Sequence, residues 1–332
     1  MMINFKEIWE SINNESKNDD SLAFAAREIQ TDSKSKLFLA SNIPLNKRLL
    51  FVLLENVPEN ISFPKFQGIE ISIIKTSLGF YKDKNFLCLK QSIEGVDNIF
   101  ELVISDIANS IINMTPDKDL IITFLNSLET WKHFFEKNKS KSLSVEKQKG
   151  LFGELIYLRD FVFKQVDFSM AIESWKGPDR AYHDFEFRKI AVEIKTTSGK
   201  EHKKFMISSE KQLDMLELDN LYLGLFSLNV HFNEIGQTLT DLIDECSNLL
   251  SEFAAAKYAF DLKLLKSGFL QEHKLEYNTR FSISSIDFFE IKDDFPKIIK
   301  NNLPTGLGDI KYSVMVSACE RFKIDNNQIK LD

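Results

Sequence analysis

The stretch AYHDFEFRKIAVEIKTTSG, from Ala181 to Gly199, decides the fold of this chain. Two short runs rich in aromatic and β-branched residues flank Arg188-Lys189, a pattern that predicts a β-hairpin with a two-residue turn. Antiparallel pairing around that turn sets Asp184 opposite Glu193, and directly opposed residues lie within about 5.5 Å at Cβ. Two carboxylates at that distance repel each other, so the pattern predicts a neutralising divalent cation.

Lys195 lies on the same strand face as Glu193, because side chains alternate with a period of two, while Val192 and Ile194 point into the core. Carboxylate oxygens suit magnesium, which takes one or two protein carboxylates together with waters and phosphate oxygens. A lysine beside the metal can orient a water and stabilise charge on a phosphorus oxygen. The three side chains fit metal-assisted phosphodiester hydrolysis. The alternative is an ordinary salt-bridged strand face, with Glu193 and Lys195 solvated.

A helix precedes the hairpin in SLSVEKQKGLFGELIYLRDFVF, opening at Ser142 or Ser144, with leucines at helical spacing. Glu154 lies on this apolar stripe. An unpaired buried carboxylate is costly, so Glu154 needs a metal or a protein partner. It is either a ligand or a core-edge glutamate. Gly150 and Gly153 would let the helix approach a sheet closely.

After the hairpin, Ser209 and Gln212 form a capping-box pattern, which predicts a helix starting there. Gln212 is therefore either the reciprocal cap or part of the site. The apolar run from Leu221 to Phe226 is typical of a central strand.

A literal Pro178-Asp179 also occurs, but Gly-Pro-Asp favours a tight turn. We therefore choose Asp184 as the aspartate of the site. A one-residue slip of the hairpin would turn Asp184 away from Glu193 and invalidate this choice.

The helix with Glu154, the strands with Asp184 and Glu193-x-Lys195, and the segment with Gln212 together resemble the PD-(D/E)xK nuclease superfamily. More narrowly, the chain resembles a bacterial PD-(D/E)xK family found in restriction and anti-phage defence loci. The segments that carry this resemblance are GLFGEL, WKGP, HDFEF, VEIKTTS and H-x-x-x-x-ISSEKQL. The likeness is close over residues 145–230.

This resemblance implies an α/β fold with a restriction-endonuclease-like core, a mixed sheet flanked by helices. It also implies DNA as substrate and Mg²⁺ or Mn²⁺ as cofactor. The expected catalytic residues are Glu154, Asp184, Glu193, Lys195 and Gln212, and the metal ligands among them are Asp184, Glu193 and Glu154.

The net charge of −7 is unusual for a protein that grips DNA through most of its surface. Local basic clusters nevertheless flank the predicted site, and we expect them to contact the DNA backbone. Their members are Lys147 and Lys149 before it, and Lys200, His202, Lys203 and Lys204 after it. The alternative is a solvated linker and a solvated loop.

The three cysteines are far apart and lack ligand spacing, so neither a disulfide framework nor a zinc site is expected. The first 20 residues lack the basic-then-apolar layout of a signal peptide, and no apolar run reaches the ~18 residues of a membrane span. We expect a cytoplasmic protein without membrane association.

The length favours two domains. We expect an N-terminal α+β domain with a structural or partner-binding role over residues 1–135. A Lys-rich connection follows over residues 136–149, and the nuclease-like domain occupies residues 150–332. Helices are expected over 3–12, 98–114, 120–135 and 238–256, and strands over 47–54, 68–74, 85–90, 281–291 and 311–324.

Three functions compete for this architecture. The first is a magnesium-dependent deoxyribonuclease of a restriction or anti-phage system. The second is a module that binds nucleic acid without cutting, and the third is a scaffold subunit of a defence complex that contacts other proteins. We favour the first, because a site that had lost its activity would have no reason to keep a repulsive acid pair. The sequence is also compatible with a homo-oligomer.

Overall fold

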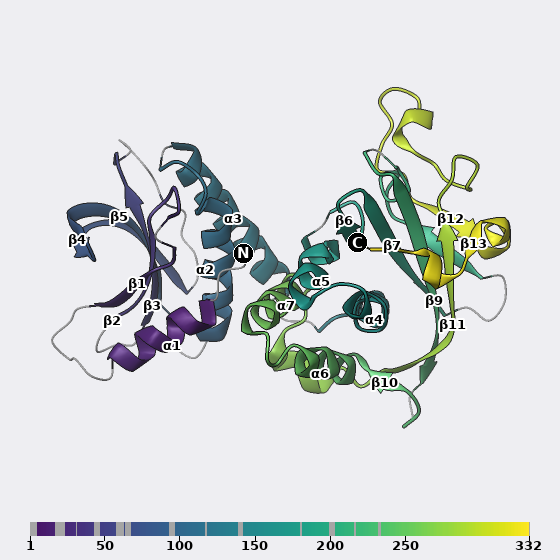
Figure 1. Cartoon of the computed structure of the whole chain (residues 1–332), viewed down its shortest axis with the longest axis horizontal. Helices are drawn as coiled ribbons and strands as arrows, with labels where there is room; N and C mark the ends of the chain where they lie inside the picture. The colour runs from purple at the N-terminus through teal and green to yellow at the C-terminus, as the bar shows by residue number, and fades with distance from the viewer. Residues whose placement is uncertain are drawn as a thin grey trace. The chain divides into compact units, whose positions relative to one another are not determined.

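The computed structural model has a mixed α/β architecture that divides into two compact units, Met1–Ser140 and Lys141–Asp332 (Figure 1). It describes residues 5–16, 24–30, 32–42, 47–57, 63, 68–92, 97–116, 118–138, 142–179, 181–198, 203–215, 217–231 and 234–331. Within these ranges no helix is both long and apolar enough to cross a membrane.

In its described residues the first unit is an antiparallel sheet with three helices, and its strands are ordered β1-β2-β3-β5-β4. Its elements are α1 (Phe5–Ser16), β1 (Phe24–Glu28), β2 (Leu37–Asn42), β3 (Lys47–Leu54), β4 (Ile69–Leu78), β5 (Tyr81–Gln91), α2 (Asp97–Ile111) and α3 (Lys118–Asn138). Helix α1 packs on β1 and β2, and α2 packs on β3 and α3.

The second unit contains the predicted site. Its main elements are α4 (Val145–Asp160), α5 (Phe168–Ser174), β6 (Phe185–Phe187), β7 (Ile190–Thr197), β8 (Lys204–Ile207), β9 (Asn220–His231), β10 (Gln237–Thr238), α6 (Leu239–Leu249), α7 (Ala254–Lys266), β11 (Arg280–Glu290), β12 (Tyr312–Met315) and β13 (Lys323–Ile324). The strand order of its main sheet is β10-β11-β9-β7-β6, with β13 beside β11. Strands β7 and β9 run parallel, and the other pairs are antiparallel.

Two cores cover the two faces of this sheet. On one face, Val192 and Ile194 of β7 are buried with apolar side chains of α4, α5, α6 and α7, which gather on one side of the sheet in Figure 1. On the other face, Ala191 is buried with residues of the small β8–β12 sheet. Because side chains alternate along a strand, Glu193 and Lys195 share the face of Ala191.

The predicted hairpin and its register are confirmed. Phe185 pairs with Val192 and Phe187 with Ile190, so Arg188 and Lys189 form the turn. Arg188 has φ of 47°, the left-handed conformation that Asn or Gly would normally supply in such a turn.

Helix α4 begins where the sequence predicts, with the Ser144 hydroxyl accepting the Lys147 N–H as its N-cap. The predicted close approach to the sheet holds at Gly153, where an added Cβ would lie 2.5 Å from Thr196 Cγ2. At Gly150 the prediction is wrong, because a Cβ added there would have no described heavy atom within 4 Å apart from its chain neighbours and the backbone of its own helix.

Three predicted elements differ from the structure. Residues 208–213 form a turn instead of a helix. A capping box would need the Gln212 side chain to accept the N–H of Ser209. It accepts the N–H of Ser208 instead. The helix expected over 238–256 is two helices, α6 and α7, although its cap at Thr238 is confirmed. The strand expected over 311–324 is interrupted by two 3₁₀ turns. Their buried residues Val316, Cys319 and Phe322 recur every third position, the spacing of a 3₁₀ helix.

Candidate active site

Strand β7 presents an acid and an amine side by side. The Glu193 side chain is only 1% exposed, and its Oε1 lies 2.7 Å from Lys195 Nζ. Lys195 is 14% exposed, so the ion pair has limited contact with water. Of the two alternatives weighed from the sequence, the solvated strand face is therefore wrong.

Asp184 immediately precedes β6, and backbone groups fix it on both sides. Its Oδ2 accepts the N–H of Ile194 at 2.7 Å, which holds its carboxyl group against β7 beside Glu193. Its main-chain oxygen accepts the N–H groups of Lys176 and Gly177 at 2.7 and 3.0 Å. The hairpin therefore also anchors the loop from Trp175 to Asp179.

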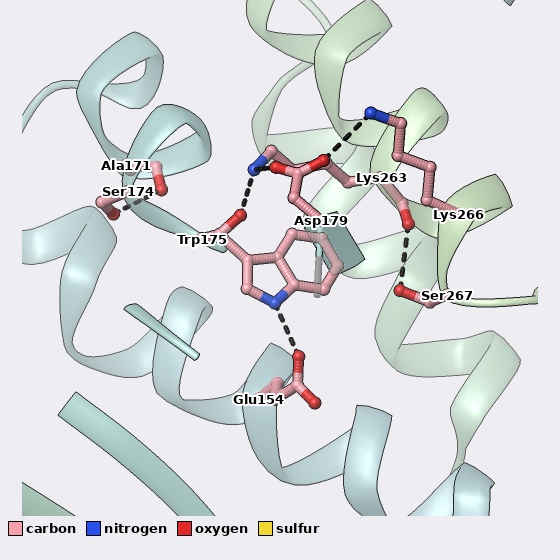
Figure 2. Close-up of polar contacts among 8 residues, drawn as sticks. All are labelled: Glu154, Ala171, Ser174, Trp175, Asp179, Lys263, Lys266 and Ser267. Carbon is pink, nitrogen blue, oxygen red and sulfur yellow. Dashed lines mark hydrogen bonds and ion pairs between the residues drawn. The ribbon is translucent and has the colours of Figure 1, made fainter. Parts of the chain in front are cut away.

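Glu154 reaches this cluster from α4. Its Oε2 accepts the indole N–H of Trp175 at 2.7 Å (Figure 2). A Cβ added at Gly177 would lie 2.7 Å from this Oε2 and 3.0 Å from Oδ1 of Asp184. The two carboxyl groups thus converge on Gly177, whose missing side chain leaves the space beside them open.

Burial and mutual repulsion disfavour ionisation of these acids. Burial, reinforced by the charge of Asp184, raises the pKa of Glu154 well above its usual value and that of Glu193 to about 8. Burial also raises the pKa of Asp184, against the opposing effects of Lys195 and the Ile194 N–H. Burial alone would lower the pKa of Lys195, but Glu193 and Asp184 raise it. Three carboxyl groups thus share one lysine, which leaves the cluster short of positive charge.

Gln212 completes the surroundings of the lysine. Its Oε1 accepts from Lys195 Nζ at 3.2 Å and from the N–H of Ser208 at 2.8 Å. The Gln212 amide therefore orients the Lys195 ammonium group and also closes the turn from Ser208 to Gln212. All five predicted catalytic residues lie in one cluster.

The literal Pro178-Asp179 lies outside this cluster. Asp179 forms ion pairs with Lys263 and Lys266 of α7, each at 3.0 Å. Burial alone would raise the pKa of Asp179, but these two lysines lower it. Asp179 therefore anchors the loop to α7, while Asp184 lies beside Glu193.

The predicted DNA-contacting residues have different environments. Lys147 and Lys204 are exposed, and Lys203 is half-buried, with its amine 3.3 Å from the Ser227 hydroxyl. Lys149 is buried, 2.7 Å from Glu146 and 3.1 Å from the Ser198 hydroxyl, so its amine already has two partners. Lys200 and His202 lie outside the described residues.

The sequence argument assigned no role to Trp175 or Gly177, which both contact the site acids. A tryptophan two residues before a Gly-Pro turn was the available signal, because a buried indole N–H needs an acceptor. The spacing of residues along the chain could not identify Glu154 as that acceptor.

The donor set fits a hard divalent cation. Within the described ranges no group of three or more His, Cys, Asp or Glu side chains is already arranged as a metal shell. Magnesium, however, needs only one or two protein carboxylates. Of the two buried carboxyl oxygens of Glu193, Oε1 pairs with the Lys195 ammonium, whereas Oε2 has no hydrogen-bond donor among the described residues. A cation facing Glu193 and Asp184 would satisfy the acceptors that remain.

The fold and the site together define the class of the protein: an α/β protein in which a hairpin of a mixed sheet carries an acid pair and a lysine. A family model described as "Putative PD-(D/E)XK family member, (DUF4420)" matches residues 5–317. The chain belongs to this family, and the match spans both compact units. Comparisons with curated proteins and with solved structures give no match.

Proposed function

We propose that this protein is a divalent-metal-dependent nuclease that hydrolyses phosphodiester bonds in DNA, with a restriction-endonuclease-like core in the second unit. The observation that carries the proposal is the placement of Glu193 and Lys195 on β7 with Asp184 held against that strand by the Ile194 N–H. Family membership supports the same chemistry.

Asp184 and Glu193 would hold Mg²⁺ or Mn²⁺, and Glu154 would add a third carboxylate directly or through water. When bound, the cation supplies Lewis-acid polarisation of the phosphate and offsets the repulsion among the acids. The electrostatics fit this role, since burial and the charge of Asp184 raise the pKa of Glu193 to about 8.

Lys195 has three N–H donors. Glu193 Oε1 and Gln212 Oε1 lie within reach of the ammonium, which leaves one donor for a water or a phosphoryl oxygen. A charged donor fixed before the substrate arrives stabilises negative charge that develops on the phosphate without reorganising. In this proposal Lys195 is the transition-state stabiliser and Gln212 orients it.

DNA would contact the exposed Lys147 and Lys204, with Lys200, His202 and Lys203 on the same segment as Lys204 as further candidates. The chain as a whole carries a net charge of −7, which argues against a broad DNA-binding surface. We therefore assign the first unit a structural or partner-binding role within a cytoplasmic bacterial defence complex, in which the chain could also form a homo-oligomer.

The test is cleavage of plasmid and single-stranded DNA with Mg²⁺ or Mn²⁺, against a chelator control. We expect metal-dependent cutting that Glu193→Gln abolishes. Asp244→Asn is the matched control, because it also removes a carboxylate paired with a lysine, Lys274 at 2.9 Å, but on the exposed surface of α6.

Cutting that persists in the chelator would refute the metal mechanism. DNA binding without any cutting, in wild type with metal, would instead identify a binding module that has kept the fold.

A further inference from the structure

Trp175 occupies a special position beside the acid cluster. Its side chain is fully buried, and its indole N–H donates to Oε2 of Glu154 at 2.7 Å. That same oxygen and Oδ1 of Asp184 lie 2.7 and 3.0 Å from the position that a Cβ on Gly177 would occupy. The indole therefore fixes the Glu154 oxygen that faces Gly177 together with the Asp184 carboxyl group.

The indole is itself held in place from several sides. Its ring packs on Phe260 of α7 with centroids 5.9 Å apart, and its backbone forms an isolated bridge with Phe185 at the start of β6. The main-chain oxygen of Trp175 accepts from Lys263 Nζ (Figure 2). Small movements of the ring are therefore opposed by α7 and by the hairpin.

Lys263 binds both ends of the loop from Trp175 to Asp179. It is buried on α7, and the amine that bonds the Trp175 oxygen also pairs with Asp179 at 3.0 Å. Gly177 lies between these two anchored residues. The Pro178-Asp179 turn thus acts through Lys263 to fix the loop, although Asp179 does not touch the acids.

We infer that Trp175 is a positioning residue for Glu154, and that its indole N–H sets the carboxyl orientation in which Glu154 and Asp184 face a cation together. This inference rests on the proposed metal-dependent function. A purely structural tryptophan would affect stability only, whereas a positioning tryptophan changes metal affinity, and does so only while residue 154 is a glutamate.

The test replaces the donor and keeps the ring. Trp175→Phe removes the N–H, and site-specific incorporation of 3-benzothienylalanine at 175 removes it with the bicyclic shape retained. Trp131→Phe is the matched control, because Trp131 is also buried and donates to a carboxylate, Asp106 Oδ2 at 2.9 Å, in the first unit. Calorimetric titration with Mn²⁺ measures affinity, and circular dichroism verifies folding.

Loss of one hydrogen bond to a charged group corresponds to a fall in Mn²⁺ affinity of about tenfold or more. We expect this fall in both position-175 variants, no change in Trp131→Phe, and no further fall when Trp175→Phe is added to Glu154→Gln. A folded benzothienylalanine variant with wild-type affinity would overturn the inference alone. A wild-type protein that neither binds Mn²⁺ nor cuts DNA would overturn the proposed function and this inference with it.

Discussion

Neutralising Glu193 should stabilise the metal-free protein, and the gain should grow with pH. Burial, followed by the charge of Asp184, raises the pKa of Glu193 to about 8, from 4.5 for an unperturbed glutamate. Between these values the folded state binds the proton more tightly than the unfolded chain does. Stability therefore falls as pH rises from 4.5 to 8 and levels off above that.

The magnitude follows from the size of the shift. Each pKa unit corresponds to about 1.4 kcal/mol, so the penalty on folding grows by on the order of 3 kcal/mol between pH 5 and pH 8. Glu193→Gln has no proton to lose and can still accept from Lys195. Its stability should be close to that of the wild type at pH 5 and higher at pH 8.

The assay is urea denaturation followed by circular dichroism at pH 5, 6, 7 and 8, with chelator throughout. Asp244→Asn, at the exposed pair on α6, should leave the pH dependence of the wild type unchanged. If wild type and Glu193→Gln show parallel stability curves, then Glu193 ionises normally in the fold and the reasoning about the cluster is refuted.

Three further predictions concern single residues of the site. Lys195→Ala should keep Mn²⁺ affinity but lower the single-turnover cleavage rate by roughly 10²-fold, the effect of losing one transition-state donor; an equal loss of binding would make Lys195 architectural. Glu154→Gln should lose cleavage while its metal-free melting temperature stays level or rises, and a clear drop in that temperature with cleavage retained would assign Glu154 to structure. Gly177→Ala should weaken Mn²⁺ binding in calorimetry, because its Cβ would lie 2.7 Å from Glu154 Oε2; wild-type affinity in this variant would show that the open space has no role.

The hairpin could be predicted from sequence because its information is local. Phe185 and Val192 are separated by a short turn, and an alternating pattern allows one register that buries both. The same locality explains why the cap at Thr238 and the start of α4 at Ser144 were predictable.

Contacts between distant segments could not be predicted in this way. The Glu154 partner, Trp175, lies across a loop and a helix, and the buried environment of Lys149 depends on Ser198 at the end of β7. Gln212 kept its place in the site although its predicted helix does not form, because its side chain serves Lys195 and a turn together.

The break between α6 and α7 shows a similar limit. No glycine or proline marks it in the sequence, and the apolar spacing continues through it. Leu250 and Ala256 are both buried in the same core, so tertiary packing decides where the helix ends.

The position of β11 in the sheet affects how the second unit folds while the chain is being synthesised. Strand β9 is hydrogen-bonded to β7 on one side and to β11 on the other, and β11 comes about 50 residues later in the chain. Until Arg280–Glu290 leaves the ribosome, one edge of β9 has unpaired backbone N–H and C=O groups, and the apolar side chains of β9 lack part of their cover. Such a surface aggregates or recruits chaperones. Fragments ending before residue 280 should accumulate as inclusion bodies, and the acid cluster should gain its supporting sheet only after Arg280–Glu290 has been synthesised.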